Sequence, residues 1–493
     1  MKITEVRLGL ISVPLRVPFK TALRSVSSVE DVIVEIHTDT GAVGYGEAPP
    51  TGVITGDTTG AIIGAIRDHI AKTIVGRDVD DFEDLMIALN ACIQKNTSAK
   101  AAVDMALWDL YGQLYKIPVY KLMGGAKKSI VTDITISVND PEEMVRDAQN
   151  AIQRGYDCLK VKVGKEPEKD IARLSAIRAA VPKETCIRID ANQGWTPKEA
   201  VRILNGMQER GLDLEFVEQP VKAHDFEGLK YVTERSYVPV LADESVFSPQ
   251  DALTIMQMGA ADLVNIKLMK CGGLYNALKI ASAAEVYGVE CMIGGMLEAK
   301  ISVNAAVHLA CAKQIITRVD LDGPVLCSED PILGGAVFNE KDITVSNEPG
   351  LVETSLNLGV AELDDSEAIL RFSLRSSVPS AKELLSCKLQ TLTELLGGTV
   401  RFHGDYPAWT YARESALRDR CVAVYEAQYG AKPQIVALHA GLECGILSGK
   451  IDGLDCISFG PNLLHVHTPN ERADIASVAR VWEYLKAILA YKA

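Results

Sequence analysis

The chain has 493 residues, of which 47% are hydrophobic and 24% charged, and its formal net charge is −14. This length predicts more than one domain, and the acidity argues against nucleic acid or an anionic membrane as a partner. The 11 cysteines form no CxxC pair, the N-terminus lacks a signal-peptide core, and no apolar run has membrane-spanning length. We therefore expect a cytoplasmic protein with reduced thiols.

Residues 1–125 predict an α+β domain. Alternating apolar and polar residues in ITEVRLGLISVPL, DVIVEIHTDTG and AVGYGEA predict antiparallel strands joined by turns with glycine or aspartate. Helical periodicity follows over residues 59–74, 81–95 and 98–116. The polar segment FKTALRSVSS, between the first two strands, is expected to be a loop.

Residues 126–320 alternate short apolar runs with amphipathic stretches, which is typical of a parallel sheet covered by helices. We expect an α/β fold with a TIM-like (β/α) barrel. Its eight strands are expected near residues 132–137, 158–163, 186–190, 214–218, 239–242, 263–267, 290–293 and 317–320. The turn-rich residues 321–356 are expected to fold back onto the first domain.

The remainder of the chain differs in composition. Residues 357–368 are polar and acidic and are expected to form a linker. Residues 369–493 predict a separate, partial α/β domain, with helices near 380–397, 410–429 and 474–490 and strands at 434–438 and 455–458. Four of the 8 histidines lie in this tail, namely His403, His439, His465 and His467.

Three carboxylates and two lysines recur at the ends of successive predicted barrel strands. Intervals of 28, 28, 25 and 24 residues separate, in order, Lys162, Asp190, Glu218, Asp243 and Lys267. One βα unit has about this length, since about 250 residues divide among eight units. The C-terminal strand ends converge on one mouth, so the three acids are expected to hold Mg²⁺, which prefers oxygen ligands. The alternative for any single acid is a helix N-cap.

The run CLKVKVG places Lys160 and Lys162 on one face of a strand, because side chains alternate between the two faces. Inside a barrel, two such ammonium groups are expected to lower each other's pKa, which helps one act as a base. The alternatives are an edge strand protected by lysines and, for Lys267, a solvated side chain. Asn192 and Glu244 lie next to the acids and are expected to orient the metal ligands.

These motifs resemble the enolase superfamily, and within it the muconate-lactonizing branch. The resemblance covers residues 1–356 and rests on LKVKVG, RIDANQGW, FVEQPV, LADES and NIKLMKCGG. It implies a capping domain over residues 1–125 and a catalytic barrel over residues 126–320. It also implies that Lys162 and Lys267 act on opposite faces of the substrate α-carbon. One Mg²⁺ per active site would hold the substrate carboxylate and stabilise an enediolate.

Two further features resemble dipeptide epimerases of this branch. Asp320 and Asp322, in ITRVDLDGP, match the pair that holds the α-ammonium group of a dipeptide. Arg24 would grip a side-chain carboxylate from a loop over the site, although a solvated loop charge is the alternative.

The resemblance thus implies an isomerase that inverts the C-terminal residue of small dipeptides such as L-Ala-D/L-Glu, by two-lysine 1,1-proton transfer, in cell-wall peptide metabolism. A cycloisomerase or dehydratase of the same branch is the alternative enzyme. A non-catalytic dipeptide-binding or assembly protein is the alternative from another class.

Other substrate contacts are expected around the barrel mouth. Thr135 lies on the first predicted barrel strand, and Lys160 lies beside Lys162. Gly295 and Met296 belong to CMIGGMLEAKIS, where glycine lets the backbone lie close to the dipeptide. Residues 46–58 resemble the second lid loop of the family.

The tail resembles the C-terminal part of cytosolic aminoacyl-histidine dipeptidases, which are two-zinc peptidases. The resemblance spans residues 368–493 and rests on LRSSVPSAKELL, GDYPAWTYARESALRDRCVAVYEAQYG, HAGLECGILSGKIDGLDCISFGP and HVHTPNERADIASVARVWEYL. It implies that His467 matches a zinc ligand and that Arg375 and Gly441 match substrate contacts. The other zinc ligands of that family have no counterpart here, and one histidine cannot hold two zinc ions. We therefore expect a remnant without peptidase activity that packs or dimerises within a homo-oligomer.

Overall fold

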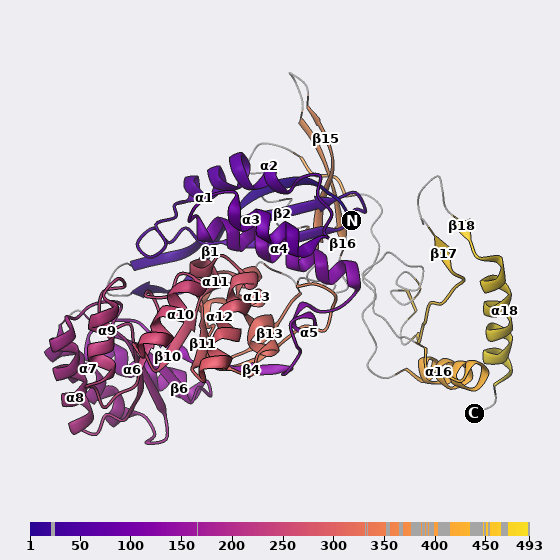
Figure 1. The fold of residues 1–493 in the computed structure, drawn as a ribbon. Coiled ribbons are helices and arrows are strands. Elements are labelled where there is room, and N and C mark those ends of the chain that lie inside the picture. The colour runs from indigo at the N-terminus through magenta and orange to yellow at the C-terminus, as the bar shows by residue number, and fades with distance from the viewer. Residues whose placement is uncertain are drawn as a thin grey trace. The chain divides into compact units, whose positions relative to one another are not determined.

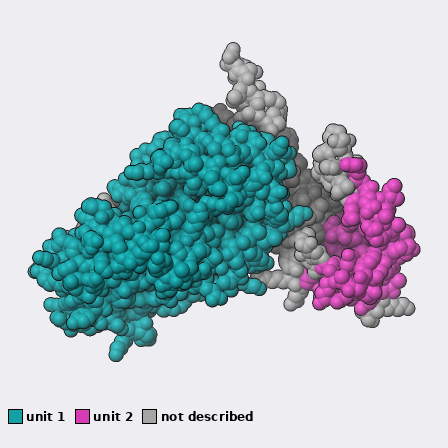
Figure 2. Space-filling view, viewed as in Figure 1, with its two compact units in different colours: residues 1–353 teal, residues 354–493 magenta. Residues whose placement is uncertain are grey.

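The structure, a computed structural model, describes residues 1–20, 25–164, 166–330, 332 and 334–351. Farther along, it describes residues 355–363, 368–375, 386, 390, 393, 399–402, 415–433, 447, 450–451, 454–464 and 472–491. The chain divides into two compact units, Met1–Glu353 and Thr354–Ala493 (Figure 2). In the described part of the chain, no helix is long and apolar enough to cross a membrane.

The first unit begins with a three-stranded antiparallel sheet covered by helices (Figure 1). The strands are β1 (Ile3–Lys20), β2 (Ser25–Thr38) and β3 (Val43–Ala48). The helices are α1 (Thr59–Ala65), the π-helix η1 (Ile66–Ile70), α2 (Ala71–Ile74), α3 (Phe82–Ala91), α4 (Thr97–Tyr115) and α5 (Val119–Leu122). Gly44 and Gly46 let β3 lie directly on α4, because a Cβ at either position would overlap a backbone carbonyl of that helix.

The prediction of a loop at FKTALRSVSS is wrong for residues 19–20 and 25–28, which belong to strands β1 and β2. β1 continues through Phe19, which pairs with Val26, and Lys20 pairs with Ser25. Polar residues can extend a strand when the facing strand satisfies their backbone groups, which sequence periodicity does not register. Residues 21–24, including Arg24, lie outside the described residues.

The second part of this unit is a parallel barrel of eight strands alternating with helices. The strands are β5 (Ile134–Ile136), β6 (Cys158–Lys162), β7 (Cys186–Asp190), β8 (Leu214–Glu218), β9 (Val240–Ala242), β10 (Leu263–Ile266), β11 (Glu290–Gly294) and β12 (Ile316–Asp320). They are hydrogen-bonded in this order. The first and last strands also approach each other, since Asp133 N donates to Val319 O at 3.3 Å. The predicted fold class, a capping domain with an eight-stranded barrel, is confirmed.

Helices cover the outside of the barrel. They are α6 (Pro141–Gln153), α7 (Pro167–Ala180), α8 (Pro197–Glu209), α9 (Phe226–Thr233), α10 (Pro249–Met258), α11 (Leu268–Cys271), α12 (Leu274–Tyr287) and α13 (Lys300–Ala312). Several start with proline at the first helical position, where its missing N–H costs no hydrogen bond. A separate buried cluster of Phe216, Leu241, Leu263 and Met292 gathers side chains from four consecutive strands, so this part of the barrel is packed solid.

The residues after the barrel return to earlier parts of the unit. α14 (Gly323–Leu326) is followed by β13 (Val337–Asn339) and β14 (Asp342–Thr344), and β14 pairs with β4 (Ser129–Val131). Gly350 N then donates to Ile117 O at 3.2 Å, and Leu351 N donates to Asp109 Oδ1 at 2.6 Å. These bonds attach the end of the unit to α4 and to the turn before α5.

Among its described residues, the second unit contains two helices and two pairs of antiparallel strands. β15 (Ser355–Leu363) pairs with β16 (Ala368–Arg375), and β17 (Leu463–Leu464) pairs with β18 (Arg472–Ala473). α16 (Ala416–Tyr429) and α18 (Ile475–Ala490) share a small core of Cys421, Val424, Tyr484 and Ile488.

Two expectations for the tail differ from the structure. Most of residues 357–368, expected as a linker, belong to the β15–β16 hairpin, because their apolar residues alternate with polar ones and find a facing strand. Residues 455–458, expected as a strand, are not in one. The expected strand at 434–438, Gly441 and the four tail histidines lie outside the described residues, as does most of 380–397.

Candidate active site

The acids and lysines expected at the barrel mouth lie together. Lys162, Asp190 and Glu218 each end a strand, and their Cα atoms are register partners across β6, β7 and β8. Asp243 directly follows β9, and Lys267 directly follows β10. Because the strands are parallel, all five residues lie at the same end of the barrel.

Each lysine of the predicted catalytic pair binds one of the acids. Lys162 Nζ lies 2.6 Å from Asp190 Oδ2. Lys267 Nζ lies 2.8 Å from Asp243 Oδ2 and 3.7 Å from Glu218 Oε1. The three carboxylates are at most 1% exposed, and buried charges persist only when they are paired. The lysines enter from strands separated by three others, β7, β8 and β9, so they reach the acids from different sides of the mouth.

Lys160 is the most heavily paired cation of the site. Its Nζ lies 2.6 Å from Asp320 Oδ2, 2.6 Å from Glu218 Oε2 and 3.4 Å from Asp190 Oδ2. The expectation that the paired lysines lower each other's pKa is wrong for Lys160. Burial lowers its pKa, but the charges of these three carboxylates raise it well above its ordinary value. Lys160 is therefore a fixed ammonium group in this arrangement, not a base.

The buried groups at and beside the barrel mouth include more carboxyl groups than ammonium groups, namely Asp190, Glu218, Asp243, Glu244, Asp320 and Asp322 against Lys160, Lys162, Lys267 and Lys270. Burial raises the pKa of Glu218 to about 7, and the charge of Asp190 adds to the rise. Burial also raises the pKa of Glu244 to about 8. Glu244 Oε2 and Asn192 Oδ1 are buried and accept no hydrogen bond within the described part of the chain. A set of buried oxygens short of positive charge fits a hard divalent cation such as Mg²⁺.

The two aspartates after β12 have different environments. Burial alone would raise the pKa of Asp320, but nearby lysine charges, above all that of Lys160, lower it to about 2. Burial and the charge of Asp320 raise the pKa of Asp322 to about 6. Asp322 Oδ2 accepts a hydrogen bond of 2.7 Å from Thr135 N. Asp320 is thus already paired with Lys160, whereas Asp322 forms no salt bridge with a lysine or arginine among the described residues.

A pocket lies over these groups. It is lined by most of the residues predicted from the sequence: Thr135, Lys160, Lys162, Asn192, Asp243, Glu244, Lys267, Gly295, Met296, Asp320 and Asp322. Asp190 and Glu218 are fully buried next to it. Thr51, Val53 and Ile54, from the expected lid loop, also line the pocket. The position of Arg24 falls outside the described residues.

Several pocket residues carry no signal of their own in the sequence. Phe19 lines the pocket from β1, within the segment expected as a loop. Glu298 accepts hydrogen bonds from Met296 N at 2.8 Å and from Ser302 Oγ at 2.5 Å. It therefore shapes the segment that carries Gly295 and Met296. The periodicity of the sequence predicts neither the place of Phe19 in the pocket wall nor the hydrogen bonds of Glu298, because both depend on contacts made after folding.

Lys270 is a further buried residue of the site. It lies three residues after Lys267 and so on the same side of the start of α11. Its Nζ lies 2.5 Å from Asp243 Oδ1 and also donates to the Asp243 carbonyl, whereas Lys267 binds Oδ2. One oxygen of Asp243 is thus held by Lys270 and the other faces Lys267. The spacing within NIKLMKCGG is the one sequence signal for this role.

Lys270→Met is expected to lower the free energy of unfolding by about 3–5 kcal/mol, because it leaves one oxygen of a buried carboxylate unpaired. Urea denaturation followed by tryptophan fluorescence measures the loss. The control is Lys169→Met, since Lys169 forms an exposed pair of 2.6 Å with Glu166 and its loss is expected to cost about 0–1 kcal/mol. Equal losses in the two variants would show that Lys270 contributes no more than a surface lysine.

Comparison with known families agrees with this geometry. Residues 3–124 match the mandelate racemase/muconate lactonizing enzyme N-terminal domain, and residues 143–354 match the enolase C-terminal domain-like family. The chain therefore belongs to the enolase superfamily, in its mandelate racemase and muconate-lactonizing branch. More particularly, it is 59% identical over 357 residues to the L-Ala-D/L-Glu epimerase of Clostridium acetobutylicum, covering 72% of this chain and 100% of the relative.

Solved structures of dipeptide epimerases are also similar to this chain. The L-Ala-D/L-Glu epimerase of Bacillus subtilis, in a substrate-liganded complex, superposes with a TM-score of 0.71 at 46% identity, over 71% of this chain and 98% of that one. The dipeptide epimerase of Enterococcus faecalis, complexed with Mg and L-Leu-L-Tyr, gives a TM-score of 0.69 at 41% identity, over 71% and 99%. In each case the similarity covers the first unit.

Proposed function

We propose that this chain is a Mg²⁺-dependent dipeptide epimerase that inverts the C-terminal residue of L-Ala-D/L-Glu. The observation that carries the proposal is the pair Lys162 and Lys267, which reach one buried carboxylate cluster from different sides of the barrel mouth. The similarity to L-Ala-D/L-Glu epimerases supports the substrate, and Mg in the solved relatives supports the metal.

The two lysines would exchange the α-proton between the faces of the substrate. One lysine, as a neutral amine, takes the proton from the α-carbon and becomes an ammonium group. The other, already an ammonium group, donates a proton to the opposite face and becomes neutral. When bound to Asp190, Glu218 and Asp243, Mg²⁺ would stabilise the negative charge that develops on the substrate carboxylate. Lys160, held by three carboxylates, would remain protonated and position them.

Substrate recognition would depend on charge at both ends of the dipeptide. Asp322, with Asp320 beside it, would bind the α-ammonium group, since its carboxylate faces the pocket without a lysine partner among the described residues. Arg24 is our candidate for binding the side-chain carboxylate of the second residue. Thr135, Gly295 and Met296 would contact the dipeptide along the pocket wall.

The test is proton exchange in D₂O. Incubation of L-Ala-L-Glu with the protein and Mg²⁺ should yield L-Ala-D-Glu and place deuterium at the α-carbon of the glutamate, as followed by NMR. N-acetyl-L-Ala-L-Glu, which lacks the ammonium group, is the matched control and should react poorly. Binding of L-Ala-L-Glu without any exchange would instead identify a dipeptide-binding protein.

The KM for L-Ala-L-Glu is expected to rise as the pH falls below about 6. The ammonium group binds the ionised form of Asp322, whose pKa in the free protein is about 6, so at lower pH this carboxyl must first lose a proton. The rise should approach about tenfold per pH unit. Steady-state kinetics from pH 5 to 8 measure it. Asp322→Asn should raise the KM and remove this inflection, whereas a retained inflection would assign it to another group.

For the tail, we propose a peptidase-like remnant without hydrolase activity that contributes to a homo-oligomer. Support comes from the relatives, since 357 residues of this chain cover 100% of the Clostridium acetobutylicum enzyme.

Truncation after Glu353 is expected to leave kcat and KM unchanged, because all residues with a proposed catalytic role lie before that point. Oligomer size, measured by light scattering, is expected to change if the tail covers apolar surface between subunits. The full-length protein should not hydrolyse aminoacyl-histidine dipeptides with Zn²⁺ supplied. Zn²⁺-dependent hydrolysis that is lost in His467→Ala would contradict the proposal for the tail.

A further inference from the structure

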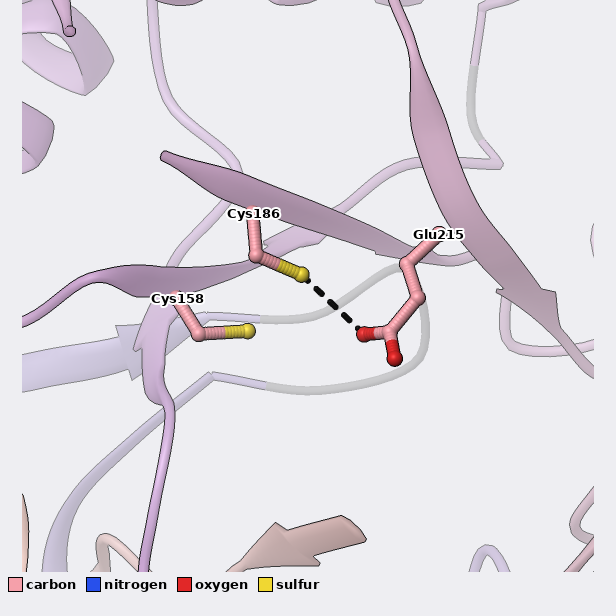
Figure 3. Close-up of side chains that lie close together, drawn as sticks. All are labelled: Cys158, Cys186 and Glu215. Carbon is pink, nitrogen blue, oxygen red and sulfur yellow. Dashed lines mark hydrogen bonds between the residues drawn. The ribbon is translucent and has the colours of Figure 1, made fainter. Parts of the chain in front are cut away.

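A second group of potential metal ligands lies at the opposite end of the barrel from the proposed active site. Cys158 and Cys186 begin β6 and β7, whose last residues are Lys162 and Asp190. Glu215 is the second residue of β8. The three side chains point toward one another from three consecutive strands (Figure 3). None of them has a role in the proposed epimerase reaction.

The ligand atoms of this group are already close. Cys158 and Cys186 are register partners on neighbouring strands, and the two sulfurs and a Glu215 oxygen all lie within 4.8 Å of one another. Cys186 Sγ donates to Glu215 Oε2 at 3.1 Å. A tetrahedral Zn²⁺ with Zn–S bonds of about 2.3 Å holds two sulfurs about 3.8 Å apart. Side-chain shifts of about 1 Å would therefore bring the thiols around an ion.

The surrounding charges fit the replacement of thiol protons by a cation. Arg188 Nε donates to Glu215 Oε2 at 2.7 Å, and Arg318 Nε donates to Glu215 Oε1 at 2.9 Å. A divalent ion that displaces one proton from each thiol leaves the net charge of the group unchanged. The arginines would thus meet no added positive charge, and their charge favours the two thiolates.

We propose that Cys158, Cys186 and Glu215 form a binding site for a thiophilic divalent cation of the Zn²⁺ or Cd²⁺ class. Two S–H bonds break, two metal–sulfur bonds form, two protons go to solvent, and no electron is transferred. Glu215 supplies the third ligand and water the fourth. The thiolates select against Mg²⁺, which prefers oxygen ligands, so this site and the Mg²⁺ site would load independently. The bound ion would link β6, β7 and β8 and stabilise the barrel.

The test is titration of the reduced, full-length protein with Cd²⁺. The parent protein should show thiolate-to-Cd²⁺ charge-transfer absorption in the ultraviolet, release protons on binding, and gain thermal stability. Cys158→Ser and Cys186→Ser should each lose this site. Cys92→Ser is the matched control, since Cys92 is similarly half-buried but lies outside the barrel strands, and it should behave like the parent. The kcat with Mg²⁺ should be the same with and without Cd²⁺ at this site.

A second measurement uses the parent protein alone. Bound Cd²⁺ should protect Cys158 and Cys186 of the parent protein from alkylation, as mapped by peptide mass spectrometry, while Cys92 reacts at an unchanged rate. Alkylation of both barrel thiols at the same rate with and without Cd²⁺ would overturn the proposal. So would a Cd²⁺ titration of Cys158→Ser that equals the titration of Cys92→Ser, or a Cys158–Cys186 disulfide that persists in the protein under reducing conditions.

Discussion

Lys162→Ala and Lys267→Ala are each expected to lower the kcat for epimerisation of L-Ala-D/L-Glu by about 10²–10⁴-fold, the usual contribution of a positioned acid or base. Net inversion needs proton removal on one face and proton delivery on the other, so either substitution removes the group that performs one of these two steps. Each variant is nevertheless expected to exchange the α-hydrogen of one epimer with solvent, through the lysine that remains.

Chiral chromatography measures inversion, and NMR in D₂O measures exchange for each epimer separately. Lys198→Ala, an exposed lysine of α8, is the control for the loss of a positive charge and should retain the parent kcat. Parent-rate epimerisation by either Lys162→Ala or Lys267→Ala would exclude the two-lysine scheme. The same result would leave the proposed metal ligands untouched, so the two parts of the mechanism are tested separately.

Glu218→Gln is expected to abolish turnover and to weaken Mg²⁺ binding by more than about 100-fold. Substitutions of residues that only orient metal ligands weaken binding by up to about 100-fold, so the loss of a ligand itself should have a larger effect. The substitution keeps the shape of the side chain and removes its charge. Isothermal titration calorimetry with Mg²⁺ gives the affinity independently of activity. Near-normal affinity would remove Glu218 from the ligand set.

Although Glu218→Gln should lose turnover and Mg²⁺ affinity, its free energy of unfolding should not fall. Burial raises the pKa of Glu218 to about 7 in the folded protein, so ionising this group costs folding free energy once the pH rises above its ordinary, unfolded value. Without Mg²⁺, Glu218→Gln should therefore be at least as stable as the parent at pH 8, as measured by urea denaturation. Glu209→Gln, at the end of α8, is the control for an exposed glutamate. A large loss of stability at pH 8 would mean that the glutamate supports the fold and not a cation.

Much of this protein was determined by its sequence alone. The period of the apolar runs predicted all eight barrel strands, because a strand buried on both faces requires a short apolar run whatever its neighbours are. The spacing of Asp190, Glu218 and Asp243 predicted one shared mouth, since parallel strands place their C-terminal ends together. The motifs around them indicated the superfamily and the dipeptide substrate.

The tertiary structure decided what depends on groups distant in the sequence. Lys160 becomes a fixed cation because Asp320, 160 residues away, lies against its ammonium group, and electrostatic energies follow distance in space, not position in the chain. Distance in space also explains why Asp320 and Asp322 differ in pKa although the motif treats them alike. The nearby Lys160 lowers the pKa of Asp320, whereas burial and the charge of Asp320 raise the pKa of Asp322. The extension of β1 through Phe19 depends on its partner β2. Local patterns determine which elements form, whereas charge, pairing and burial at the site exist only after these elements have met.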